Sequence, residues 1–201
     1  MAKKNDNRIV LKTPVGRLSF PYLTKKDEGR QYSDGKFKTD LLFTKEQWKT
    51  EGKELTTAVL EVAKKHFGKA VKLKDFKHPF VDTDTVNNIP DNMKGMIRIR
   101  AKSTNAPQIV GPDKKPLTAE KIAEIKGGDY ARLVVSVFPY DQQGGGVSLG
   151  LNFVQFARPG EPFGQGTSKM LDMLDEMEVT LEDGIEESES SESEEDDLAF
   201  A

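Results

Sequence analysis

A long β-hairpin pattern limits the fold of this chain more than any other feature of its sequence. Apolar and polar side chains alternate over residues 130–140, and a second strand pattern returns over residues 147–156. Glycines in residues 142–146 between them are typical of a turn. The apolar face of the first strand consists of Ala131, Leu133, Val135 and Val137. Such alternation predicts one face packed on a core and one face open to a partner or to solvent.

Further strand patterns precede this hairpin. Residues 8–23 predict two short strands around a Pro-Val-Gly turn, and strand patterns recur over 36–43, 96–102 and 107–110. Residues 69–94 contain two prolines and many polar groups, so we predict irregular structure there. Residues 118–125 predict one or two helical turns.

One substantial helix is predicted among these strands. Thr44 and Gln47 have the spacing of a capping box, and Gly68 suits a C-terminal stop. Between them, apolar residues recur at helical spacing: Leu55, Val59, Val62, Ala63 and Phe67. The pattern predicts a single helix from Thr44 to Phe67, and Trp48 in its first turn is expected to pack rather than bind.

Five or more strands with one inserted helix predict a mainly β domain. An oligonucleotide-binding (OB) fold, a five-stranded Greek-key barrel, is the natural candidate, although periodicity alone leaves another α+β barrel open. We expect the OB domain to span residues 1–166. Residues 167–177 predict a short amphipathic helix or linker, and residues 178–201 predict a disordered acidic tail, since they contain too little apolar surface to offset chain entropy.

Charge is divided unevenly along the chain. Residues 171–201 contain fourteen Asp and Glu and neither Lys nor Arg. Of the whole chain's 30 bases and 33 acids, residues 1–170 therefore hold all 30 bases and 19 acids, a net charge of +11. A basic body favours polyanionic partners, and a tethered acidic tail would compete for the same surface.

The sequence gives little sign of catalysis. The chain has no Cys, and His66 and His78 lack the spacing of a metal-ligand pair. The glycines at 144–146 lack the Lys-Ser/Thr that follows in a phosphate-binding loop. We therefore predict no enzyme activity, no cofactor and no metal. The N-terminus lacks the pattern of a signal peptide, and no apolar run approaches the ~20 residues of a membrane span, so we expect an intracellular protein without membrane contact.

Cationic and aromatic side chains suggest a binding surface for a single strand of nucleic acid. Arg98, Arg100 and Lys102 share one strand face, with about 7 Å between neighbours, which is close to a nucleotide step. A solvated outer face is the alternative. The less apolar face of the first hairpin strand carries Arg132, Phe138 and Tyr140, where the rings either stack on bases or pack in the core or at the sheet edge.

A second basic and aromatic patch is predicted around the Asp34-Gly35 turn. Its members are Tyr32, Lys36 and Lys38. Phe37 belongs as readily to the core, because Leu41 and Phe43 share its face.

Several segments resemble a bacteriophage family of single-stranded DNA-binding proteins, distant relatives of the phage T7 protein of that function. These segments are residues 130–141, 146–155, 158–164 and 32–43. The resemblance implies an OB fold, no catalysis and an acidic, aromatic-ended tail that binds replisome proteins. One difference is that the T7-like tail ends in Phe, whereas Ala201 follows Phe200 here.

Residues and resemblance together favour a sequence-independent single-stranded DNA-binding protein of phage replication or recombination, located in the cytoplasm of the infected bacterium. Its expected partners are single-stranded DNA and replication or recombination proteins, and self-association on DNA is left open. The residues expected to bind a protein partner are Glu194, Glu195, Asp196, Asp197, Leu198 and Phe200. An acidic-tailed chaperone or DNA mimic that binds basic partners is the alternative, and a nuclease is a third hypothesis without a convincing metal cluster.

Overall fold

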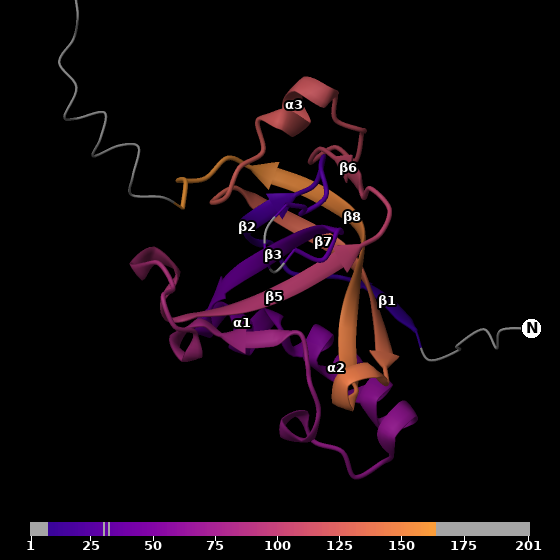
Figure 1. Ribbon diagram of the computed structural model, residues 1–201. Coiled ribbons are helices and arrows are strands. Elements are labelled where there is room, and N and C mark those ends of the chain that lie inside the picture. Colours follow the sequence, from indigo (N-terminus) through magenta and orange to yellow (C-terminus); the bar gives the residue numbers. More distant parts are fainter. Residues whose placement is uncertain (1–7, 30, 32, 164–201) are drawn as a thin grey trace, which may run out of the picture. The chain divides into compact units, whose positions relative to one another are not determined.

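Five strands close into a barrel in the computed structural model (Figure 1), which describes residues 8–29, 31 and 33–163. They are β2 (Gly16–Tyr22), β3 (Phe37–Thr44), β5 (Met96–Ser103), β7 (Tyr130–Tyr140) and β8 (Gly146–Arg158). Around the barrel the order is β7-β2-β3-β5-β8, and β8 pairs again with β7. Four contacts are antiparallel and the β5–β8 contact is parallel. This is the predicted OB fold.

Three short strands extend the barrel wall. β1 (Ile9–Lys12) lies antiparallel to β7, and β6 (Gln108–Val110) lies parallel to β8. β4 (Phe80–Asp82) pairs with β5. The strands predicted over residues 8–23, 36–43, 96–102 and 107–110 are confirmed, with ends that differ by one or two residues. β4 was not predicted.

The core lies inside the barrel, as the hairpin alternation predicts. Every residue of the expected apolar face of β7 is fully buried: Ala131, Leu133, Val135 and Val137. Burying a Val or Leu side chain contributes about 1.5–3 kcal/mol each, so this hairpin is a major source of stability. In β5, Ile99 and Ala101 are likewise fully buried, which leaves Arg98, Arg100 and Lys102 on the outer side.

The predicted single helix is broken at Gly52 into α1 (Lys45–Glu51) and α2 (Lys53–Phe67). Thr44 caps α1, because its Oγ1 accepts a hydrogen bond from the Gln47 backbone N–H at 3.1 Å. The Gln47 side chain donates instead to the carbonyl of Val15 at 2.8 Å, so the capping box is only half formed. The buried face of α2 packs against β7 and β8. Phe67 is an exception to the predicted face, with 36% of its surface exposed.

The remaining short helices lie in the connections. α3 (Ala119–Ala123) confirms the helical turns predicted over 118–125. Single 3-10 turns are η1 (Leu73–Asp75), η2 (Thr83–Thr85), η3 (Asp91–Met93) and η4 (Gln142–Gly144). No helix within the described ranges is long and apolar enough to cross a membrane.

The segment predicted to be irregular contains a structured piece of the barrel wall. Phe80 pairs with Ile99 of β5, while Lys77 bridges Gly146 at the start of β8. The Val147 backbone N–H also donates to the Lys77 carbonyl at 2.8 Å. Residues 77–82 therefore fill the space between β5 and β8. The prediction failed here because these partners are distant in sequence, and a three-residue strand has no periodicity to detect.

Aromatic rings anchor this wall segment to the core. Trp48 lies with its ring centroid 5.3 Å from that of Phe43 and 5.1 Å from that of Phe80, which confirms its packing role. The series continues from Phe80 to His78 and then to Phe76, at 5.5 and 6.2 Å. A fixed aromatic ladder thus holds His78 beside the hairpin.

Candidate nucleic-acid interface

A groove of about 700 Å³ lies over the junction of β5 and β8. These two strands pair through only Ala101–Leu149 and Lys102–Gly150. On one side are β5 and the end of the loop that joins β2 to β3, and on the other is the β7–β8 hairpin. In an OB barrel, oligonucleotides bind on the face of the second and third strands and at the loops after the first and fourth strands. Here these are β3 and β5 and the loops β2–β3 and β7–β8, so the groove adjoins that surface.

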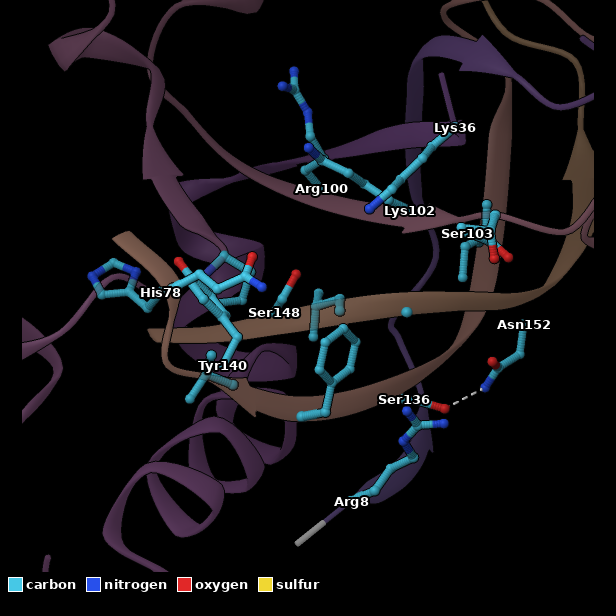
Figure 2. A pocket seen from close by; sticks show the side chains of 18 of the residues that line it. Arg8, Lys36, His78, Arg100, Lys102, Ser103, Ser136, Tyr140, Ser148 and Asn152 are labelled. Carbon is cyan, nitrogen blue, oxygen red and sulfur yellow. Dashed lines mark hydrogen bonds between the residues drawn. The ribbon is translucent and has the colours of Figure 1, made fainter. Parts of the chain in front are cut away.

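The two walls of the groove carry different chemistry (Figure 2). Lys36, Arg100 and Lys102 stand together on one side. The facing hairpin wall is aromatic and polar, with Phe138, Tyr140, Ser136, Ser148 and Asn152. Asn152 Nδ2 donates to Ser136 Oγ at 2.8 Å, which fixes the polar part of that wall. The groove thus offers cations to one side of a ligand and ring faces to the other.

Arg100 is held by a buried carboxylate. Its Nε and Nη2 donate to the two carboxylate oxygens of Asp40 at 2.7 and 2.8 Å, and Asp40 is only 1% exposed. Hydrogen bonding to Asp40 raises the pKa of Arg100 above its ordinary value. Arg98 approaches the same carboxylate, with its Nε 3.7 Å from Asp40 Oδ2. One buried acid therefore orients Arg100 and has Arg98 within ion-pair distance, which leaves a net positive charge.

Lys102 has an exposed acidic partner instead. Its Nζ lies 2.5 Å from Asp34 Oδ2, and Lys38 Nζ lies 4.0 Å from Asp34 Oδ1. Burial opposes the charged form of Asp34, but the hydrogen bond and charge of Lys102, with the charges of Lys38 and Lys36, lower the pKa of this carboxyl. Asp34 is therefore ionised at neutral pH.

The hairpin presents two aromatic rings at the groove. Phe138 and Tyr140 are half-buried on the outer face of β7, opposite the core residues. Gly150 faces Phe138 from β8, and a Cβ at that position would stand 3.3 Å from the ring. Glycine therefore leaves room beside the ring. The guanidinium carbon of Arg8 lies 5.3 Å from the Phe138 centroid and adds a further cation to this wall.

The groove brings together five of the predicted DNA-binding residues: Lys36, Arg100, Lys102, Phe138 and Tyr140. The other predicted residues are placed differently. Arg98 does not line the groove. Lys38 forms an ion pair with Asp27 and keeps only 12% of its side chain exposed. Arg132 lies in a separate hollow beside α2.

Tyr32 and the predicted partner-binding residues of the tail lie outside the described residues, as does the helix or linker predicted over 167–177.

Several groove residues were not predicted from the sequence, among them Arg8, His78 and Pro79. His78 Nδ1 accepts the backbone N–H of Phe80 at 3.3 Å, and partial burial lowers the pKa of His78, so the ring is neutral at pH 7. Only the pairing of residues 77–82 with β5 and β8 places this histidine in the groove. The sequence around His78 and Pro79 contains no local pattern that predicts their position in the groove.

A closed OB barrel with cations facing aromatic rings across a groove has the fold and the side chains of single-strand-binding proteins. The model of the family described as Enterobacter phage Enc34 ssDNA-binding protein matches residues 8–185. The chain therefore belongs to this phage family, which confirms the resemblance seen in its sequence.

Solved structures share the fold. The single-stranded DNA-binding protein of bacteriophage Enc34 in complex with ssDNA is 24% identical, with a TM-score of 0.66 over 81% of this chain and 97% of that one. The single-stranded DNA-binding protein of bacteriophage T7, gp2.5, is 18% identical, with a TM-score of 0.60 over 84% of this chain and 96% of that one.

A curated relative matches in part. Putative protein p50 of Acyrthosiphon pisum secondary endosymbiont phage 1 is 28% identical over 95 residues, which cover 47% of this chain. The match covers 51% of that protein, so the chain spans about half the length of the curated relative. The family and the solved structures are described as single-stranded DNA-binding proteins and not as enzymes.

The first prediction concerns Arg100. Arg100→Ala should lower the free energy of unfolding by about 1–3 kcal/mol, because the buried Asp40 loses its bidentate partner. Adding Asp40→Asn should restore part of that stability. Urea denaturation of the two variants measures this difference. Equal stability of the two variants would contradict the assigned role of Asp40.

The second prediction concerns the rings. Phe138→Ala or Tyr140→Ala should weaken single-strand binding by about 1–3 kcal/mol if a base stacks on the ring. Fluorescence anisotropy with a labelled oligonucleotide measures the affinity, and thermal unfolding of each variant is the control. Phe153, an exposed ring of β8 outside the groove lining, supplies a matched variant, Phe153→Ala, that should bind like the parent. Equal losses at Phe138, Tyr140 and Phe153 would remove the groove as the stacking site.

Proposed function

We propose that the chain binds single-stranded DNA in the groove without sequence preference. The observation that carries the proposal is the placement of Lys36, Arg100 and Lys102 opposite Phe138 and Tyr140. A strand lying between these walls can direct its phosphates to the cations and its bases to the rings. Bases of a duplex are stacked on one another and cannot use those ring faces, so the arrangement favours single strands.

Lack of sequence preference follows from the kinds of contact. Lysine and arginine bind phosphates, which are the same in every nucleotide, and each base has a ring face that can stack. The similar protein of phage Enc34 is described in complex with ssDNA. We place the function in phage DNA replication or recombination, inside the infected bacterium. The alternative function, an acidic-tailed chaperone, would not explain why cations and aromatic rings face each other across the groove.

Binding to single strands should depend strongly on salt. With about three to five phosphate contacts, the slope of log affinity against log salt should be roughly −2 to −3.5, at about 0.7 per contact on single strands. The four groove cations Arg8, Lys36, Arg100 and Lys102 match that number of contacts. Anisotropy titrations over a range of salt concentrations give the slope directly.

The same titrations should include a duplex of identical sequence, with and without magnesium. We expect the single strand to bind more tightly and to remain intact in both conditions. A slope near zero would reject the electrostatic part of the proposal. Preference for the duplex would reject the single-strand function, and cleavage of the strand with magnesium would favour a nuclease.

We further propose that the acidic tail regulates binding and recruits replication or recombination proteins. The support is in the sequence, where fourteen acids follow a body of net charge +11. A tethered polyanion reaches an effective concentration near the millimolar range, so it competes with DNA for basic groups. Leu198 and Phe200 add apolar side chains to an acidic run, which suits a basic pocket with an apolar lining on a partner protein.

Truncation after Met177 should tighten single-strand binding at low salt and have little effect at high salt, because salt screens the competition. Titration of both forms with the same oligonucleotide at two salt concentrations measures this. Equal affinity of the two forms at every salt concentration would reject autoinhibition. Separately, capture of host or phage replication proteins should fail with Phe200→Ala, and unchanged capture would reject the aromatic anchor.

A further inference from the structure

An acidic side chain, Asp34, forms an ion pair with Lys102, one of the cations that line the groove. Lys36 and Lys102 both line this side of the groove (Figure 2), and Lys38 lies on β3 opposite Lys102 in register. Asp34 projects among them, with Oδ2 2.5 Å from Lys102 Nζ and Oδ1 4.0 Å from Lys38 Nζ. Each oxygen of this carboxylate thus meets a different ammonium group, as the oxygens of a phosphodiester do when two lysines hold it.

We infer that the Asp34 carboxylate occupies the position of a DNA phosphate, and that phosphate binding displaces it. The inference rests on the proposed function and identifies one subsite within that groove. Its ligand is a phosphodiester group, and its cations are Lys102 and Lys38, which meet the two carboxylate oxygens. Lys36, on the groove lining, adds a further positive charge.

The two acids near the groove differ in whether they can be displaced. Asp40 is fully buried and bidentate with Arg100, so removing it from that pair would leave a buried charge without a partner. Asp34 keeps 28% of its side chain exposed and Lys102 keeps 37%. An exposed pair of this kind is worth roughly 0–1 kcal/mol, which a phosphate in the same place can replace.

The exchange requires only rotation of the Asp34 side chain. The backbone beneath it is fixed by two hydrogen bonds, from Asp27 N–H to the Lys36 carbonyl at 3.0 Å and from Gly35 N–H to the Asp27 carbonyl at 3.1 Å. The lysines therefore keep their positions while the anion changes from carboxylate to phosphate.

The test is Asp34→Asn in the full chain, which removes the charge and keeps the size of the side chain. We expect single-strand affinity to rise about three- to tenfold at low salt, and the gain to shrink as salt increases. Glu61→Gln is the matched control. It makes the same change in net charge on α2, where Glu61 pairs with exposed Lys65 at 2.7 Å, and it should alter affinity less than twofold.

Lys102→Ala completes a double-mutant cycle. Without the ammonium group that carboxylate and phosphate share, Asp34→Asn should lose most of its gain. A gain of equal size in both backgrounds would show that Asp34 acts only as a repulsive charge and would overturn the inference. Weaker binding by Asp34→Asn would also overturn it, because Asp34 would then position the lysines for DNA. Thermal unfolding verifies that each variant is folded.

The two proposals fail separately. If the parent chain does not bind single strands, the proposed function is wrong. If the parent binds and Lys102→Ala weakens it, but Asp34→Asn does not tighten it, the function stands and the phosphate position assigned to Asp34 is wrong.

Discussion

The barrel closes through a short parallel contact between β5 and β8, and the position of the groove depends on that contact. Two register pairs join the strands, at Ala101–Leu149 and Lys102–Gly150. A parallel pair needs a long crossover connection, and here the chain between the two strands also supplies β6 and α3. Because Lys102 lies within the contact, the main groove cation is fixed to the barrel wall.

Because the β5–β8 contact is short, another segment must fill the space between the two strands before they pair. Before the pairing begins, β5 and β8 are bridged by residues 77–82, with Lys77 on Gly146 and Phe80 on Ile99. A Cβ at Gly146 would stand 2.4 Å from the Lys77 carbonyl oxygen, so only glycine allows this approach. Residues 77–82 bring His78 and Pro79 to the groove, and the ring contacts through Phe80 and Trp48 anchor them to the core. The same segment therefore completes the barrel wall and shapes the groove.

Local patterns in the sequence predicted much of this fold. The alternation in residues 130–140 identified the core face of β7 residue by residue, since a strand buried on one side shows a period of two. The same argument placed Arg100 and Lys102 outward on β5. Local patterns could not reveal β4, which is held by partners distant in the chain. They also could not separate Arg132 from Phe138 and Tyr140, because all share one face of β7 and only the twist of the barrel parts them.

The positions of the charged residues could likewise be predicted from the sequence, but their ion-pair partners could not. Sequence spacing predicted a row of cations on β5, but not that Asp40 and Asp34 would each take one of them. Asp40 lies on the neighbouring strand, directly opposite Arg100 in register, and Asp34 lies on the preceding loop. These partners depend on strand pairing. They divide the predicted basic row into a guanidinium oriented by a buried acid and an ammonium group with an exchangeable counter-charge.

The most direct test of the account is to map the surface that single-stranded DNA contacts. Backbone amide shifts in a ¹⁵N-labelled protein, recorded during titration with an oligonucleotide, would locate it. The account predicts that the largest changes fall at Lys36, at Lys102 and Ser103 on β5, and at Phe138, Tyr140 and Gly150 on the hairpin. Changes confined to α2, or to β6 and α3, with the groove amides unaffected, would contradict it.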